Sequence, residues 1–330
     1  MPSPAKCRTS PPPATSRRSS ASPALVRATP SSWPNRHRAD PPLFRRQKMP
    51  QFSSSAMQDH WVDGAAGRLF VRHWPAIGTA AASFVICHGF NAHSGHYARA
   101  AEVFAQRGFA VTAPDLRGRG HSEGERFYVD SFDDYVSDLS HAIDFARAQA
   151  PDLPVYLLGH SAGGVIALSY VLGHQDRIAG LICESFAYRV FAPDFALTLL
   201  RGASHVVPHA HVLRLKIADF SRDPAWIEQL EHDPLVRDEV QPVQTVAALA
   251  RAADRLRATF DRVALPVLIL HGDADKAADV EGSREFFDAA SASDKTLKLY
   301  EGHYHDLLND LDRDRVTNDI GNWIAQRASG

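Results

Sequence analysis

The chain has 330 residues, of which 45% are hydrophobic and 22% charged, and its formal net charge is −2. This composition is typical of a globular protein with a full core, and it excludes a fibrous or largely unfolded chain. No stretch reaches the roughly 18 consecutive apolar residues that a membrane-spanning helix needs. We therefore expect one large core domain that does not cross a bilayer.

Residues 1–50 differ from the rest of the chain, because they hold ten Lys and Arg residues, eleven Pro residues and one acidic residue. Such a segment cannot bury enough apolar surface to offset the entropy lost on ordering. We predict a disordered basic head over residues 1–56. Three interpretations of this head remain open: a transit peptide, a start codon assigned too far upstream, or a basic tail that contacts nucleic acid or an anionic membrane. No nucleic-acid partner is expected for the rest of the chain.

Strand-like and helix-like segments alternate from about residue 58, where a hairpin is predicted around Asp63-Gly64. Strands are predicted at 82–87, 109–113, 154–158, 178–183, 266–270 and 296–300, and helices at 97–106, 131–146, directly after residue 161 and at 316–324. Strands that read as continuous apolar runs indicate a mostly parallel sheet with helices on both faces. The predicted class is therefore α/β, with one core domain over residues 57–330.

The alternation breaks between about residues 187 and 259, where no buried-strand run occurs. Helix-like stretches are predicted there at 194–200, 208–217 and 243–260. An insertion of this length between two strands is too long for an ordinary loop. We predict a helical cap that covers the strand ends.

A Gly-x-Ser-x-Gly pentapeptide, Gly159 to Gly163 with Ser161 at its centre, follows one apolar strand and precedes an apolar helix. A serine in this strand–turn–helix context is raised above the edge of the sheet, and the glycines let neighbouring backbone pass. The pattern predicts that Ser161 is a nucleophile, although the pentapeptide alone is a weak signal.

An activated serine needs a base and a carboxylate that orients the base, and in this arrangement they follow in the order serine, acid, histidine. Asp275 and His305 occupy the loops after the last two predicted strands, whose carboxyl ends meet at one crevice. We predict these two as the acid and the base. The alternatives left open are His303 for the base, and Asp273, Asp279 and Glu184 for the acid.

Two backbone amides are predicted to bind the oxyanion: that of Phe90, after the His88-Gly89 turn, and that of Ala162, after the nucleophile. His88 itself is expected to shape the loop without transferring protons. The segment 115–122 begins with an acid at a strand end and continues as a glycine turn, so we expect it to support the loop structurally.

Neither a metal nor a cofactor is implied by the sequence. His205, His209 and His211 could lie on one side of a turn, but they fall short of a zinc pattern because no cysteine is near. No glycine motif for a dinucleotide or a phosphate occurs. The three cysteines form no disulfide framework, which favours a reducing, cytoplasmic compartment.

The chain resembles the monoglyceride lipase and lysophospholipase family of serine α/β-hydrolases from about residue 58 to its end. The resemblance rests on three motifs in particular, at residues 88–97, 115–122 and 159–164, and on the contexts of Asp275 and His305. It implies the α/β-hydrolase fold, a Ser161–Asp275–His305 triad, and hydrolysis of a monoacylglycerol, a lysophospholipid or a related acyl ester. Apolar cap segments further suggest an acyl channel and transient contact with membrane surfaces.

This sequence departs from the family pattern at four positions: Asn91, Ala92, Ala162 and Glu184. The departures bear on the acyl or alcohol preference, since the proposed nucleophile, acid and base are all present. A thioesterase, an acyltransferase or an aminopeptidase would use the same nucleophile. An aminopeptidase would need a cap acid for the amino terminus, with Asp194, Asp219 and Glu228 as candidates. A non-catalytic binding module is the remaining alternative.

Overall fold

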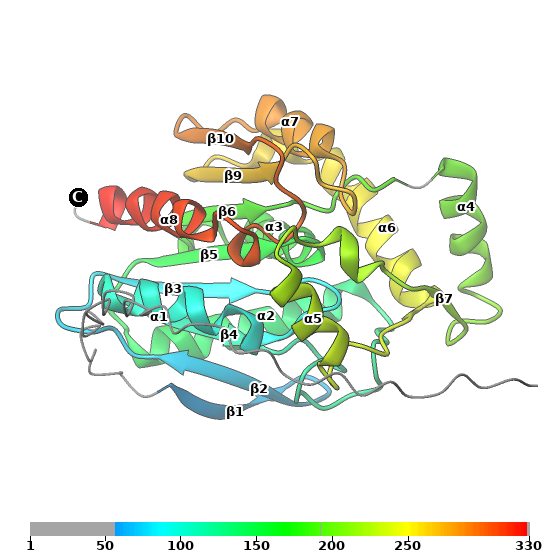
Figure 1. Ribbon diagram of the computed structural model, residues 1–330, viewed down its shortest axis with the longest axis horizontal. Helices are drawn as coiled ribbons and strands as arrows, with labels where there is room; N and C mark the ends of the chain where they lie inside the picture. Colours follow the sequence, from blue (N-terminus) through cyan, green and yellow to red (C-terminus); the bar gives the residue numbers. More distant parts are fainter. Residues whose placement is uncertain (1–56, 192, 329–330) are drawn as a thin grey trace, which may run out of the picture. The chain divides into compact units, whose positions relative to one another are not determined.

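The computed structural model describes residues 57–191 and 193–328, and the expectations for the basic head lie outside this range. A central eight-stranded sheet with the order β1-β2-β4-β3-β5-β6-β9-β10 organises the fold (Figure 1). Its strands are β1 (Gln58–Gly64), β2 (Gly67–Trp74), β3 (Ala82–Cys87), β4 (Phe109–Pro114), β5 (Val155–His160), β6 (Gly180–Glu184), β9 (Val267–Gly272) and β10 (Lys295–Tyr300).

The sheet is mostly parallel, as predicted. All pairs from β4 to β10 are parallel, whereas β1 pairs antiparallel with β2, and β2 antiparallel with β4. The β1–β2 hairpin turns two residues later than predicted, because Gly64 pairs with Gly67 and the turn lies between them. Gly67 has a φ of +121°, a conformation that favours glycine.

Helices cover both faces of the sheet, so successive strand side chains enter two different cores. In β3, Phe84 and Ile86 pack with α1 (Ala98–Gln106) and α8 (Arg313–Ala328), while Val85 and Cys87 pack with α2 (Phe132–Gln149) and α3 (Ala162–Gly173). The α7 helix (Val280–Ala289) joins the second of these cores. Both faces of the sheet are therefore shielded from water, which explains why the strands are unbroken apolar runs in the sequence.

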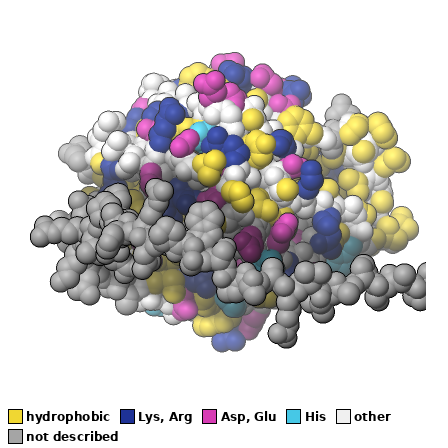
Figure 2. Space-filling model, in the orientation of Figure 1, with side chains coloured by type: hydrophobic (Ala, Val, Ile, Leu, Met, Phe, Trp, Pro, Cys, Tyr) yellow, Lys and Arg dark blue, Asp and Glu magenta, His cyan; other side chains and the backbone are white. Residues whose placement is uncertain are grey.

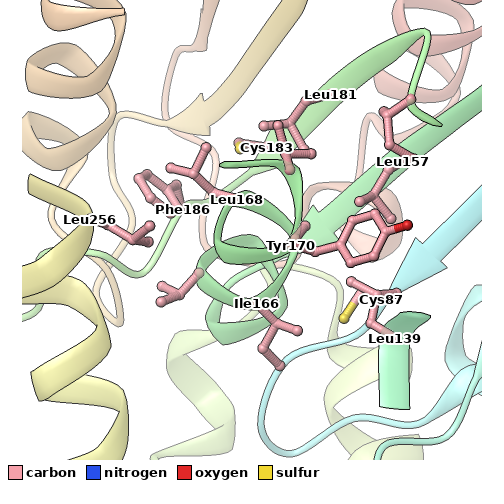
Figure 3. Packing of buried hydrophobic residues seen from close by; sticks show 14 of the residues in the cluster. Cys87, Leu139, Leu157, Ile166, Leu168, Tyr170, Leu181, Cys183, Phe186 and Leu256 are labelled. Atoms are coloured by element: carbon pink, nitrogen blue, oxygen red, sulfur yellow. The ribbon is translucent and has the colours of Figure 1, made fainter. Parts of the chain in front are cut away.

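Helix α3 follows directly after Ser161 and is apolar almost all round, since nearly every one of its side chains is buried. Figure 3 shows Ile166, Leu168 and Tyr170 of this helix among side chains from β5, β6 and α6. This packing fixes the helix rigidly behind the turn that carries Ser161.

Local sequence signals account for several helix ends. Ser131 caps α2, and its side chain accepts from the Asp133 amide while Asp134 accepts from the Ser131 amide, which completes the predicted capping box. Gly108, directly beyond α1, has a φ of +83°, in line with the left-handed cap predicted there.

The segment between β6 and β9 contains the elements that we predicted as a cap. They are α4 (Asp194–Ala203), β7 (His211–Leu213), α5 (Pro224–His232), β8 (Gln241–Pro242) and α6 (Val243–Arg257). The α6 helix packs against α3, and Ala248, Ala252 and Leu256 belong to the same core as the sheet. It is thus part of the core layer as well as part of the insertion.

The predicted helix at 208–217 was wrong, because β7 lies there and pairs antiparallel with β8. The Pro208 and Ala210 carbonyls accept hydrogen bonds from Gln244 and Val243. The backbone of this stretch therefore finds its partners in a distant segment, which short-range periodicity cannot reveal. None of the helices in the described part of the chain is both long and apolar enough to span a lipid bilayer.

Candidate active site

Ser161 lies on a strained turn between β5 and α3, with φ 57° and ψ −122°. Its amide donates to the Glu184 carbonyl at 2.9 Å, which ties the turn to the end of β6. A Cβ atom at Gly163 would lie 2.2 Å from the Cys87 carbonyl oxygen, and one at Gly159 would lie 2.4 Å from the Gly163 carbonyl oxygen. The two glycines are therefore required by the close approach of backbone around the serine.

Gly89 brings the loop after β3 against the serine. A Cβ atom at this position would lie 2.8 Å from Ser161 Cβ and 3.3 Å from Ser161 Oγ. Phe90 follows directly, and Ala162 is the first residue of α3, where a helix leaves its amide without a partner inside the helix. Both predicted oxyanion amides thus come from segments adjoining Ser161, and their role stays a prediction.

His305 and Asp275 form a buried hydrogen-bonded pair, with 2.7 Å between Nδ1 and Oδ2. The Asp275 Oδ1 atom accepts from the amides of Ala277 and Ala278, which fixes the carboxylate. The His305 ring centre lies 5.0 Å from that of His160, the residue before Ser161. Two loops from the carboxyl ends of β9 and β10 therefore deliver the acid and the base to the end of β5.

The Asp275–His305 pair is electrostatically coupled. Burial favours neutral forms, but the Asp275 carboxylate outweighs it and raises the pKa of His305 above 6.5. Burial likewise opposes the charge of Asp275, yet His305 and His271 hold its pKa well below the usual range. His271, which sequence reasoning missed, places Nε2 3.0 Å from Asp275 Oδ2 and Nδ1 2.7 Å from Ser283 Oγ.

The alternative residues bind elsewhere. His303 Nδ1 donates to the Glu301 carbonyl, and Asp273 accepts from the Gly302 amide. Asp279 caps α7 by accepting from the Glu281 amide. The His303 and Asp279 contacts are local backbone bonds of turns, whereas the Asp273 contact joins the loop after β9 to the loop after β10.

Glu184 is also directed away from the predicted base. Its Oε1 atom accepts from the Leu308 amide at 3.0 Å, and the residue is fully buried at the end of β6. The geometry therefore favours Asp275 as the group that orients His305.

His88 is a structural histidine with a defined tautomer. Its Nδ1 donates to the Gly89 carbonyl at 2.7 Å, and its Nε2 accepts from the Leu116 amide at 2.9 Å. Burial lowers the pKa of His88 to about 3, so the ring stays neutral. As predicted, it shapes the loop.

Asp115 supports the same region from the end of β4. Its two carboxylate oxygens accept from the amides of Ser94 and His121, and its carbonyl accepts from Ser122 Oγ. A Cβ atom at Gly120 would lie 2.0 Å from Asp115 Oδ2. The acid and the glycine turn are therefore parts of one rigid loop.

A buried ion pair that sequence reasoning missed joins this loop to the inserted segment. Arg119 donates to Glu239 and, at 2.8 Å, to Gln241 Oε1, while its guanidinium lies 4.2 Å from the Phe90 ring centre. The same Glu239 carboxylate accepts from the Asn91 amide at 2.8 Å. The loop with the proposed oxyanion amide is thus fastened to residues 239–241. A cavity of about 360 Å³ adjoins Asn91 and Glu239.

A second junction to the inserted segment consists of His93, His96 and Asp233. Both Nε2 atoms lie 2.9 Å from Asp233 Oδ2. The Gly95 amide donates to His93 Nδ1, so the proton of His93 is on Nε2 and points at the carboxylate. The cluster therefore works as a hydrogen-bonded junction.

Within residues 57–191 and 193–328, two groups of three side chains have potential metal-ligand atoms close together. One is the His93 junction, and the other consists of His160, Glu184 and Asp306. The histidines at 205, 209 and 211 form no such group, and His209 instead pairs with Glu125 at 2.7 Å.

The chain was compared with known families and proteins. Residues 78–312 match the family described as serine aminopeptidase, S33. Human monoglyceride lipase is 32% identical over 275 residues, which cover 82% of this chain and 91% of that protein. Monoacylglycerol lipase from Mycolicibacterium smegmatis is 29% identical over 276 residues, covering 82% of this chain and 98% of that protein.

Among solved structures, the monoacylglycerol lipase of Paleococcus ferrophilus is similar with a TM-score of 0.72 and 26% identity. The match covers 78% of this chain and 99% of that chain. These findings decide the family. The chain belongs to the monoglyceride lipase family of α/β-hydrolases.

The family assignment confirms the resemblance on which the predicted fold and enzyme class depended. The chain is a serine hydrolase with an α/β-hydrolase fold. Glu184 lies directly behind the serine turn, where it is buried beside a second acid, Asp306.

Proposed function

We propose that the chain hydrolyses acyl esters, with monoacylglycerol as its substrate, through an acyl-enzyme on Ser161. The observation that carries this mechanism is the Asp275–His305 hydrogen bond. Because Nδ1 donates to the carboxylate, the lone pair of the neutral imidazole is on Nε2, which is the atom that takes the Ser161 proton. Asp275 then stabilises the imidazolium that forms.

The covalent step follows from these positions. Ser161 Oγ attacks the ester carbonyl carbon, and the Phe90 and Ala162 amides bind the resulting oxyanion. His305 returns its proton to the leaving alcohol as the ester bond breaks. A water molecule, deprotonated by His305, then cleaves the acyl-enzyme and releases the fatty acid.

Monoacylglycerol is favoured as the substrate by the similarity to monoglyceride lipases across most of the chain. A lysophospholipid carries the same acyl ester and is the neighbouring candidate. The cavity beside Asn91 is lined by Leu215 and Ile217 together with charged side chains, so it offers both an apolar wall and a polar rim.

We also propose transient membrane contact through the inserted segment. Phe191, Phe195, Leu199 and Val206 are 62%, 70%, 68% and 79% exposed, and Figure 2 shows apolar side chains gathered where α4 lies. Exposed apolar patches of this kind mark surfaces that contact proteins or lipids. For a cytoplasmic enzyme with a lipid substrate, contact with a bilayer would bring the ester to the crevice; the free cysteines Cys87 and Cys183 suit such a compartment.

An aminopeptidase is the second candidate, because the matched family is described by that activity. Such an enzyme needs an available acid for the substrate's amino terminus. The Asp219 carboxylate forms an ion pair with Lys216, with 3.6 Å between Oδ1 and Nζ, and the Glu239 carboxylate forms an ion pair with Arg119. Glu228 is exposed on α5 and is therefore the acid, among these three, that is available for an amino terminus.

The test compares the wild type with Ser161→Ala. A fluorophosphonate probe should label only the wild type, and hydrolysis of monoacylglycerol should be lost in the variant while its circular dichroism is unchanged. Acyl esters from short to long chain, a lysophospholipid and an aminoacyl p-nitroanilide should be assayed in parallel. Labelling of the variant, or a preference for the anilide, would contradict the proposal.

A further inference from the structure

Two acidic side chains, Glu184 and Asp306, are buried together behind the active site. Glu184 is the last residue of β6 and Asp306 follows His305, and their exposed fractions are 0% and 6%. One carboxylate oxygen of Glu184, one of Asp306 and one ring nitrogen of His160 all lie within 4.8 Å of one another. Two ionised carboxylates this close and this deeply buried would repel each other strongly.

The hydrogen bonds around the two acids are unequal. Asp306 accepts from Trp226 Nε1 at 2.9 Å and from Asn309 Nδ2 at 3.1 and 3.2 Å. Glu184 accepts from the Leu308 amide through Oε1, whereas its Oε2 has no partner. Donors stabilise the charged form of a carboxylate, so the negative charge belongs on Asp306.

His160 belongs to the same buried group. Its Nδ1 lies 2.9 Å from the Tyr97 hydroxyl, and the His305 backbone is a second hydrogen-bond partner of the ring. Burial keeps the pKa of His160 well below 6.5, so the ring is neutral. A proton on Glu184 Oε2 removes the charge from a buried oxygen that accepts no hydrogen bond, which lowers the cost of burying it.

We propose that Glu184 is protonated in the folded enzyme and that the Glu184–Asp306 pair is a positioning device, which fixes the His305 loop and adds one negative charge behind the imidazole. This inference rests on the proposed role of His305 as the base. Burial and the neighbouring Asp306 raise the pKa of Glu184 well above 4.5, and they outweigh the Leu308 and Leu307 amides, which lower it. Burial raises the pKa of Asp306 to about 6, so Asp306 is ionised in the neutral range.

The charged surroundings of the pair are few. Tyr97 and His160 face it from the loop after β3 and from β5, and His305 adjoins Asp306. Asp310 also faces Asp306, but its charge is matched by Arg222, whose Nε lies 2.8 Å from Asp310 Oδ2. A single proton on Glu184 therefore leaves the Glu184–Asp306 pair with one net negative charge, in addition to the charge of Asp275 in the Asp275–His305 pair.

The first experiment measures urea unfolding of the full chain as wild type, Glu184→Gln and the exposed-acid control Glu102→Gln. An acid whose pKa is raised by folding contributes stability below its unfolded pKa, and this stability is lost as pH rises through its folded pKa. The quantity followed is the unfolding constant of the wild type divided by that of the variant. From about pH 5 to about pH 9, this ratio should rise for Glu184→Gln by up to about tenfold per pH unit. For Glu102→Gln the ratio should not change with pH.

A ratio for Glu184→Gln that is independent of pH would overturn the proposal, because it would mean that Glu184 titrates alike in both states. Metal analysis of the purified protein is run in parallel. A stoichiometric divalent ion that stabilises the wild type but not Glu184→Gln would likewise overturn the proton assignment. Neither readout depends on activity, so a failure of the proposed esterase function would be seen separately with Ser161→Ala.

The second experiment measures the pH profile of kcat/KM. Asp306→Asn removes the charge behind His305, so its acid limb should move to lower pH by about half a unit or more. Glu184→Gln replaces a neutral acid by a neutral amide and should leave the limb in place. The reverse result, with Glu184→Gln moving the limb and Asp306→Asn not, would overturn the assignment of charge and proton.

Discussion

Gly89 and Ser161 are in such close contact that a Cβ atom at residue 89 would lie 2.8 Å from Ser161 Cβ. The same atom would lie 2.9 Å from the His160 carbonyl oxygen, which is backbone and cannot turn away. The loop after β3 and the serine turn therefore fit together only while residue 89 has no side chain.

Gly89→Ala should accordingly displace the serine turn and lower kcat/KM by about tenfold to a hundredfold, since small errors in the position of a nucleophile are costly. Steady-state kinetics on a soluble ester measure the effect. Gly173→Ala is the matched control, because nothing lies within 4 Å of a Cβ atom there. Equal activity of both variants would contradict the tight fit.

Asp275→Asn should reduce kcat by about 10³–10⁴-fold, because an amide cannot hold His305 in the same tautomer or stabilise the imidazolium. Glu184→Gln should retain most of the activity, since Glu184 bonds to the Leu308 amide and not to His305. Single-turnover rates of the two variants make the comparison. A larger loss for Glu184→Gln would reverse the assignment of the acid.

The activity should depend on the protonation of His305. Because Asp275 raises the pKa of His305 above 6.5, kcat/KM should fall as pH decreases through a value above 6.5. In Asp275→Asn the residual activity should have its acid limb at lower pH, because the neutral amide no longer favours the imidazolium. Profiles of kcat/KM from about pH 5 to about pH 9 measure the acid limb of the wild type and that of the variant. An acid limb at the same pH in both would argue against the coupling of Asp275 to His305.

Glu239→Gln should destabilise the fold by about 3–5 kcal/mol, because it leaves the buried Arg119 guanidinium without its carboxylate. Urea denaturation measures the loss. The exposed Arg68–Glu123 pair provides the control, and Glu123→Gln should destabilise the fold far less, because solvent screens that pair. Similar losses in both variants would show that burial of the first pair does not matter.

Phe195→Ser with Leu199→Ser should weaken binding to phospholipid vesicles while leaving hydrolysis of a short, water-soluble ester unchanged. The reason is that both side chains are exposed on α4. Leu311→Ser, at an exposed apolar position outside the patch, is the control. Vesicle flotation measures binding, and unchanged flotation of the double variant would contradict membrane contact through α4.

The sequence carried enough information for the sheet and for the placing of Ser161, Asp275 and His305. Buried parallel strands are continuous apolar runs, so their ends could be located, and residues at the carboxyl ends of such strands converge whatever their separation in sequence. The hydrogen bond between Asp275 and His305 is the geometry that this reasoning anticipates.

The inserted segment was harder to predict because its structure depends on distant partners. Three residues of β7 are held by β8 about thirty residues away, and α5 begins at Asp223-Pro224, a cap signal that we did not use. The Arg119–Glu239 pair and the His271 contact also join residues whose types alone reveal nothing of their pairing. Such contacts are fixed by tertiary packing and leave no periodic trace.

The anchoring of Glu239 has a consequence for how a fatty ester reaches the enzyme. Movement of the inserted segment away from the core at Glu239 would leave the buried Arg119 guanidinium without its carboxylate, which costs a large free energy. On the α4 side, Phe195 and Leu199 are exposed, and the Arg201–Asp254 pair that holds α4 to α6 is at the surface, so local movement there costs less. We expect lipid substrate to enter at α4, on the face proposed to contact the bilayer, so that it reaches the nucleophile without entering bulk water.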